Sequence, residues 1–245
     1  MVYEAVEEVN SVGLFQLISV NPSSGVELPA DITNKDMIVL VHGLWMRGWV
    51  MAWLAWRLRR CGFQVVSFSY PSVRSTLTEN ASRLARFVSE LDAARIHFVG
   101  HSLGGLVLLQ MLASYPDARM GRVVLAGCPY RSSFAASKLC RSGLGRRLVG
   151  RSIAQWLGHL EPITIGEHEI GVIAGSKRLG AGRLIGGIPQ PNDGVVMVTE
   201  TKLNGARDQI VLNVCHSCML VSAEVARQAC AFLRQGYFLH DTESK

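Results

Sequence analysis

The sequence predicts an α/β fold, with a mostly parallel sheet and helices on both of its faces. Short apolar runs alternate with longer helix-like segments along the chain, which is typical of repeated strand–helix–strand units. Runs such as 37–41 and 96–99 are continuously apolar, as strands are when helices cover both faces of a sheet. The 245 residues show no internal repeat and no linker, so we expect one domain over residues 1–245.

Local sequence signals predict each element in turn. Residues 13–20 alternate weakly before a turn rich in Pro, Ser and Gly, which indicates an early hairpin or edge strand. Apolar runs predict strands at 37–41, 64–69, 96–99, 122–126, 170–174 and 209–214. Helical patterns predict helices at 48–61, 76–91 and 223–236, and one after Ser102 that ends near Tyr115. Residues 240–245 are expected to form a loose tail.

The segment 131–168 interrupts the alternation of strands and helices. It scatters Ser, Gly and Arg among Leu, Val and Trp156. A long connection between two strands usually has a function of its own. Because helical pieces such as 148–157 could cover a pocket, we expect a lid or cap insertion around 131–168.

Composition narrows the classes of partner. The net charge is +6 and 49% of the residues are hydrophobic, but the chain has no long Lys/Arg block and no nucleic-acid motif. These features predict no nucleic-acid partner. The apolar content favours a large buried parallel sheet, and the alternative, compatible with it, is affinity for lipid or for a substrate with an apolar portion. The positive charge favours, weakly, a peripheral contact with an anionic membrane surface. Neither feature gives a signal for an oligomeric state.

The amino-terminal residues and the cysteines bear on location and metal binding. Residues 1–8 lack the basic region and apolar core of a signal peptide, and no uncharged apolar run reaches membrane-spanning length. We therefore expect a cytoplasmic protein whose six cysteines are reduced thiols. Cys215 and Cys218 have the spacing of zinc ligands, but no second Cys or His pair accompanies them. The sequence thus predicts no metal site and no cofactor.

Ser102 stands in the stretch Gly-His-Ser-Leu-Gly-Gly (100–105), between a predicted strand and a predicted helix. Glycines two residues before and after a serine allow a sharp turn that exposes the hydroxyl at the carboxyl end of the sheet. The first amides of the following helix favour negative charge at the same place. Ser102 is therefore a candidate nucleophile, and the alternative is a small polar residue in a turn.

A serine nucleophile needs a base and a group that orients the base. His216 directly follows the predicted strand 209–214, so it lies at the same end of the sheet as Ser102. The other histidines lie within a strand, in the serine turn, in loops or in the tail. His216 is the candidate base, and the alternative is a loop histidine beside two structural thiols.

Asp193 is the candidate orienting carboxylate. It stands in the turn Gln-Pro-Asn-Asp-Gly, beyond the predicted strand 170–174. Asp208 and Glu169 precede their strands, which places them at the amino end of the sheet, the wrong side for this role. The alternative for Asp193 is an ordinary turn aspartate, a common use of Asn-Asp-Gly.

Acyl transfer also needs N–H donors for the developing oxyanion. The Leu103 amide begins the helix after Ser102 and is one candidate. The other should come from the loop after the first apolar strand, where Gly43 lets the backbone come close. The Leu44 amide is our choice there, with Trp45 next.

Tryptophans recur at positions 45, 49, 53 and 56, which would place them on one side of a helix. This spacing favours a helix that packs its aromatic rings on the sheet. Trp45 and Trp49 stand nearest the oxyanion loop. They are also candidate substrate-binding residues, or members of a membrane-facing rim.

Four motifs together resemble the α/β-hydrolase superfamily, in particular its bacterial lipase and esterase branch. They are Leu-Val-His-Gly at 40–43, the serine turn at 100–105, Asn-Asp-Gly-Val-Val at 192–196, and His216. The resemblance covers about residues 36 to 236, with the motifs in the order of the superfamily. After Gly43 the chain departs from it, because the glycine-rich run of some esterases is absent.

The resemblance implies a Ser102–His216–Asp193 triad and an oxyanion hole of the Leu44 and Leu103 amides. We therefore expect a serine hydrolase that cleaves carboxylic esters through an acyl-enzyme. A thioesterase or acyltransferase would use the same residues. A non-catalytic protein that binds a partner or a membrane on the same scaffold is the alternative from another class.

Overall fold

The computed structural model describes residues 36–158, 166–179 and 187–240. Within them it has six strands: β1 (Asp36–Val41), β2 (Gln64–Phe68), β3 (Arg95–His101), β4 (Met120–Ala126), β5 (Ile170–Gly175) and β6 (Asp208–Leu212). Every described strand pair is parallel, in the order β2-β1-β3-β4-β5-β6. This confirms the predicted parallel sheet. The expected early hairpin and the tail beyond residue 240 lie outside the described residues, and one domain over residues 1–245 stays a prediction.

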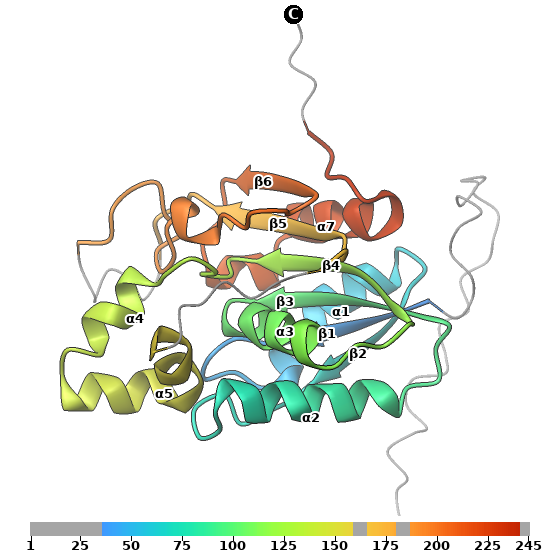
Figure 1. The fold of residues 1–245 in the computed structure, drawn as a ribbon. Coiled ribbons are helices and arrows are strands. Elements are labelled where there is room, and N and C mark those ends of the chain that lie inside the picture. The colour runs from blue at the N-terminus through green and yellow to red at the C-terminus, as the bar shows by residue number, and fades with distance from the viewer. Residues whose placement is uncertain (1–35, 159–165, 180–186, 241–245) are drawn as a thin grey trace, which may run out of the picture. The chain divides into compact units, whose positions relative to one another are not determined.

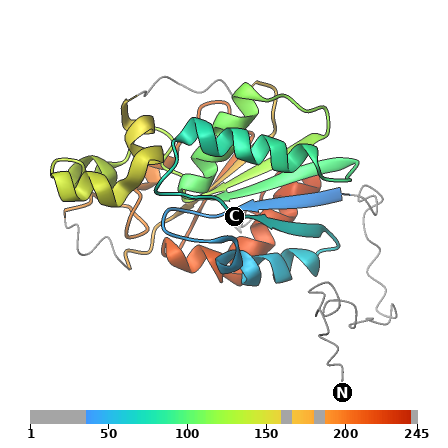
Figure 2. The same ribbon diagram turned by 90° about the horizontal axis from the view of Figure 1, so that it is seen from below.

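Helices cover both faces of the sheet (Figures 1 and 2). α2 (Leu77–Ser89) and α3 (Leu103–Ser114) pack on one face, whereas α1 (Ala52–Arg59) and α7 (Ala223–Gln235) pack on the other. In Figure 1, α4 (Phe134–Leu139) and α5 (Gly143–Gly158) lie beyond the arrowheads of the strands. Three short 3-10 helices complete the described elements: η1 (Gly48–Met51), η2 (Val198–Thr201) and η3 (Ser217–Leu220).

The alternation of side chains along β1 shows why the strands are apolar throughout. Val39 faces the core under α2 and α3, and Ile38 and Leu40 face the core under α1 and α7. All three are fully buried. Burying a side chain of this size contributes about 1.5–3 kcal/mol. A polar residue at either set of positions would face one of the two cores.

The order of the strands also leaves a crevice at the carboxyl ends of β1 and β3, where a ligand could bind. The chain passes from β1 outward to β2 and then returns to the opposite side of β1 to form β3. The connections after β1 and β3 therefore diverge to opposite faces of the sheet and leave a crevice between them. Ligands of open parallel sheets bind at such points, outside the carboxyl ends of the strands.

The tryptophan row points away from the sheet, so the prediction that these rings pack on it is wrong. The face of η1 and α1 that packs on the sheet is formed by Met51, Leu54 and Leu58, each at most 2% exposed. Trp49 and Trp53 lie on the opposite side and are 75% and 48% exposed. Helical spacing places the tryptophans together, but the smaller aliphatic side chains form the buried face.

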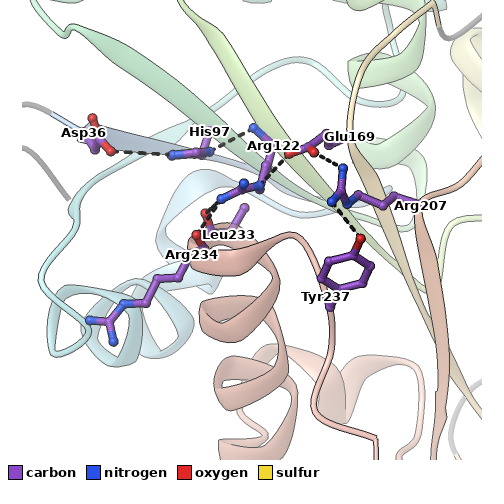
Figure 3. Close-up of polar contacts among 8 residues, drawn as sticks. All are labelled: Asp36, His97, Arg122, Glu169, Arg207, Leu233, Arg234 and Tyr237. Carbon is purple, nitrogen blue, oxygen red and sulfur yellow. Dashed lines mark hydrogen bonds and ion pairs between the residues drawn. The ribbon is translucent and has the colours of Figure 1, made fainter. Parts of the chain in front are cut away.

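The amino ends of the strands carry a polar network (Figure 3). Arg122 of β4 donates from Nε to Glu169 Oε2 at 2.6 Å and from Nη1 to two carbonyls in the last turn of α7. Arg207 bridges Glu169 and the hydroxyl of Tyr237. Glu169 thus pairs with two arginines at the amino end of the sheet, and the serine turn lies at the opposite end. Its position agrees with its exclusion as the orienting carboxylate.

One cysteine pair differs from expectation. Cys215 and Cys218 form a disulfide, so the prediction that all six cysteines are reduced thiols is wrong for this pair. The turn that begins η3, directly after His216, brings their Cα atoms to 5.0 Å, within the range that a disulfide spans. Disulfides persist mainly in oxidising compartments. The cysteines therefore no longer favour a cytoplasmic location.

Cys61, one of the free cysteines, has a perturbed thiol. A hydrogen bond with the Cys230 thiol, helped by the charge of Arg234, lowers its pKa to about 7 despite the opposing effect of burial. Only the thiolate is alkylated. We therefore expect the alkylation rate of Cys61 to rise through its midpoint near pH 7, as measured by peptide mass mapping. Cys140 is the control, because burial raises its pKa; equal pH profiles for the two thiols would contradict the expectation.

Candidate active site

Ser102 occupies a strained turn between β3 and α3. Its φ of 54° and ψ of −124° lie in a region that residues with a side chain rarely adopt. Its amide donates to the carbonyl of Ala126 in β4 at 2.9 Å, which ties the turn to the sheet. Ser102 lines a pocket at the carboxyl end of the sheet, as the sequence pattern predicts.

Glycines let the turn close against the sheet. A Cβ atom on Gly100 would lie 2.8 Å from the backbone of Gly105. One on Gly104 would collide with the carbonyl oxygen of Val41, and one on Gly105 would lie 2.7 Å from the sulfur of Cys128. Each of these positions therefore requires glycine for a packing reason, and for Gly100 and Gly104 this agrees with the sharp turn that the sequence predicts.

Gly104→Ala should destabilise the protein by more than about 2 kcal/mol, because the new methyl group meets backbone atoms that cannot move aside. Urea unfolding followed by circular dichroism measures this loss. Gly143→Ala in α5 is the matched control, since no described atom lies within 4 Å of the added Cβ. Similar unfolding midpoints for the two variants would contradict this picture of the turn.

His216 and Asp193 lie together at the same end of the sheet. His216 Nδ1 and Asp193 Oδ2 are 2.7 Å apart, and the His216 amide donates to the Asp193 carbonyl at 2.9 Å. A carboxylate can only accept, so Nδ1 carries the shared proton, and in the neutral form of the ring this leaves Nε2 as the free base. Ser102 and His216, both in the described part of the chain, line the same pocket. In this conformation of the described residues no hydrogen bond joins the Ser102 hydroxyl to the His216 ring. Such contacts often tighten only when substrate binds.

The turn around Asp193 fixes its carboxylate. Asp193 Oδ1 accepts from the amides of Val195 and Val196 at 2.9 and 2.7 Å, which leaves Oδ2 for His216. Gly194 has a φ of +100°, a conformation that favours glycine, and allows the chain to turn there. Asp193 is 1% exposed, so its contacts with the histidine are shielded from water.

Two further histidines lie nearby but have structural partners. His101 Nε2 donates to the His216 carbonyl at 3.0 Å, and burial lowers the pKa of His101 to about 3. His42 is fully buried, stacks on the ring of Tyr70 and accepts from the Tyr70 amide at its Nε2. Burial lowers the pKa of His42 as well. Both rings are therefore uncharged supports of the backbone around the site.

The two candidate oxyanion donors come from the loops after neighbouring strands. Leu103 is the first residue of α3, so its amide has no acceptor within the helix. Leu44 follows a glycine whose added Cβ would lie 3.2 Å from the Cβ of Ser102, so this loop passes close to the serine. The amide of Trp45 donates to the Ser72 hydroxyl at 3.1 Å. This occupied amide favours Leu44 over Trp45.

A cavity of about 190 Å³ opens beside Ser102 and His216. Apolar side chains form most of its wall, among them Leu44, Leu106, Leu139, Val149, Ile153 and Trp156. Helices α4 and α5, from the expected insertion at 131–168, supply much of this wall. Trp45 also lines the cavity and donates from Nε1 to the Leu148 carbonyl of α5 at 3.0 Å. Trp49 does not line it.

Sequence reasoning missed Glu200, which anchors this wall. Its carboxylate accepts from the amide of Phe134, the first residue of α4, and from the amide of Met197. Glu200 is 2% exposed, and burial raises its pKa. Its partner in α4 lies 66 positions away, and no local sequence pattern signals such a contact.

A parallel sheet that carries a strained serine turn and a buried His–Asp pair defines a class of protein. The chain belongs to the alpha/beta hydrolase family, whose model matches residues 38–207. This confirms the resemblance seen in the sequence motifs. No curated protein matches the chain.

Solved structures with a similar fold include lipases and esterases. Lipase BlEst2 of Bacillus licheniformis, in its mature form, is 19% identical with a TM-score of 0.66, over 85% of this chain and 94% of that one. The metagenomic carboxyl esterase MGS0156 is 20% identical with a TM-score of 0.59, over 76% of this chain and 65% of that one. At these identities the likeness shows the fold.

Proposed function

We propose that the protein is a serine hydrolase that cleaves carboxylic esters through a Ser102–His216–Asp193 triad. The observation that carries the proposal is the 2.7 Å contact between His216 and the buried carboxylate of Asp193, in a site where Ser102 and His216 line one pocket. A strained serine, a neutral imidazole and a fixed carboxylate are the parts that acyl transfer to a hydroxyl requires.

In the proposed mechanism the Ser102 oxygen attacks the carbonyl carbon of the ester. Nε2 of His216 takes the hydroxyl proton as the new C–O bond forms, and then gives that proton to the departing alcohol. Asp193 holds the imidazole in place and stabilises its charged form. A water molecule, deprotonated by the same nitrogen, then attacks the acyl-enzyme. The bond to the Ser102 oxygen breaks, His216 returns the proton to that oxygen, and the carboxylic acid is released.

The developing oxyanion is the second requirement of this mechanism. The amides of Leu44 and Leu103 would donate to it from opposite sides of the crevice between β1 and β3. Because these donors belong to the backbone, they need no reorganisation during the reaction, and one such donor is worth about 3–4 kcal/mol in known hydrolases.

The apolar wall of the cavity supports an apolar acyl chain. Each buried methylene contributes about 0.8 kcal/mol, which corresponds to a decrease in KM of about fourfold per methylene until the cavity is full. The names of the two similar structures, a lipase and a carboxyl esterase, agree with an ester substrate.

A series of p-nitrophenyl esters with increasing acyl length tests the proposal. We expect hydrolysis whose KM falls with chain length and then levels off. Ile153→Trp narrows the cavity and should move the optimum to shorter chains. Leu144→Trp, on the same helix but at a position that is 72% exposed, should not. Cleavage of acyl thioesters alone would instead assign a thioesterase, and cleavage of neither would leave a non-catalytic scaffold.

A further inference from the structure

The outward side of η1 and α1 carries large aromatic side chains and basic residues together. Its members are Trp49, Trp53, Trp56, Arg57 and Arg60, which we call the Trp–Arg face. The three tryptophans are 75%, 48% and 43% exposed. Folded chains rarely leave several large apolar side chains exposed in one place unless that place binds something.

Four members of the Trp–Arg face, the side chains of Trp53, Trp56, Arg57 and Arg60, contact one another. The rings of Trp53 and Trp56 stack at a centroid distance of 5.1 Å. The Arg57 guanidinium lies 5.3 and 5.6 Å from the centroids of these two rings, and that of Arg60 lies 5.0 Å from the Trp56 centroid. Cation–π attraction therefore stabilises the rings in their exposed positions beside the positive charges.

The chain segment that carries the face, and the segment that forms α4 and α5, each have charges of one sign. Between Asp36 and Glu79 the sequence contains five arginines and no acidic residue. The segment 131–158, which includes α4 and α5, contains six Lys or Arg and again no acidic residue. Long stretches of one sign attract an anionic partner and repel a cationic one.

We propose that the Trp–Arg face docks this protein on the surface of a bilayer that contains anionic lipids. Indole rings favour the headgroup level of a membrane, where the ring is partly buried and its N–H stays hydrated. Arginines beside them gain from the negative potential of that surface. The proposed contact is peripheral, because it is made by side chains on the surface of η1 and α1. No helix in the described part of the chain is long and apolar enough to span a bilayer.

The face continues toward the candidate active site. Trp45 precedes it in the chain, is 60% exposed and lines the cavity. Its hydrogen bond to the Leu148 carbonyl joins it to α5, where Leu144 and Leu148 are also exposed. Docking depends on none of the residues of the proposed triad, so the two proposals can fail independently.

Flotation of the full chain with vesicles tests the docking. We expect the wild-type protein to float with vesicles of phosphatidylcholine and phosphatidylglycerol and to remain behind with pure phosphatidylcholine. In the triple variant W49A/W53A/W56A the partition coefficient between vesicles and solution should be lower than that of the wild type by about tenfold or more. In R57Q/R60Q the same partition coefficient should fall by about fivefold for each arginine removed. R83Q/R86Q, which removes two exposed charges from α2 on the opposite face of the sheet, is the matched control.

Two further measurements make the result decisive. Circular dichroism and Tm show whether each variant is folded. Lipids brominated on the acyl chains should quench the tryptophan fluorescence of the wild type, and quench the triple variant much less. Flotation that the triple variant retains in full, or no flotation of the wild type, would overturn the proposal. Self-association of the wild type without vesicle binding, lost in the triple variant, would assign the face to a second copy of the chain.

Discussion

Ser102→Ala should lower kcat for ester hydrolysis by about 10⁴-fold or more without changing the fold, because no other group can form the acyl-enzyme. Alanine keeps the Cβ that the turn already accommodates. The hydrogen bond from the backbone amide of residue 102 to the Ala126 carbonyl does not involve the hydroxyl. The removed oxygen is therefore the main difference between the two proteins. Steady-state kinetics on the best ester of the series, together with Tm, measure both parts of this expectation.

Ser217→Ala is the matched control for that variant. Ser217 also lines the cavity, directly after His216, but it lies outside the serine turn. Its hydroxyl has no role in the proposed mechanism, so kcat should stay within a few fold of the wild type. If Ser217→Ala lost activity while Ser102→Ala kept it, Ser102 would not be the nucleophile and the assignment would be wrong.

Asp193→Asn should lower kcat by about 10⁴-fold, because an amide cannot hold the histidine in its productive tautomer or stabilise its positive charge. The asparagine oxygen can still accept from the amides of Val195 and Val196, so the turn should survive. Only the atom that faces His216 changes from an acceptor to a donor. Steady-state kinetics on the best ester of the series, together with Tm, measure this loss.

Asp208→Asn is the control for this second variant. Asp208 begins β6 at the amino end of the sheet, where its carboxylate accepts from the amide of Phe238 at 2.7 Å. We expect activity close to that of the wild type. If Asp208→Asn lost activity while Asp193→Asn kept it, the orienting carboxylate would have to be reassigned.

The strands and the serine turn could be predicted because their signals are local. Continuous apolar runs identify strands that are buried on both faces, and the spacing of the glycines around Ser102 marks the sharp turn, although the contact that requires Gly104 is made with the Val41 carbonyl of β1. His216 and Asp193 could be chosen by another rule, since residues after parallel strands gather at one edge of the sheet. The structure brings these two side chains together as that rule implies.

Other features depend on contacts that a single chain segment does not specify. Helical spacing groups the tryptophans on one side, but the fit of Met51, Leu54 and Leu58 against the sheet decides which side is buried. The Glu200 carboxylate accepts a hydrogen bond from an amide of α4 that is distant in the sequence. The Cys215–Cys218 disulfide depends on the turn at η3. Each becomes visible only when separate parts of the chain are brought into contact.

Labelling with a fluorophosphonate is the sharpest test of Ser102 as the nucleophile, because this reagent reacts with a serine that a neighbouring base activates. We expect a single adduct on the wild-type chain, located at Ser102 by peptide mapping and absent from His216→Ala. An adduct on another residue, or none on a folded wild-type protein that hydrolyses esters, would contradict the Ser102–His216–Asp193 assignment.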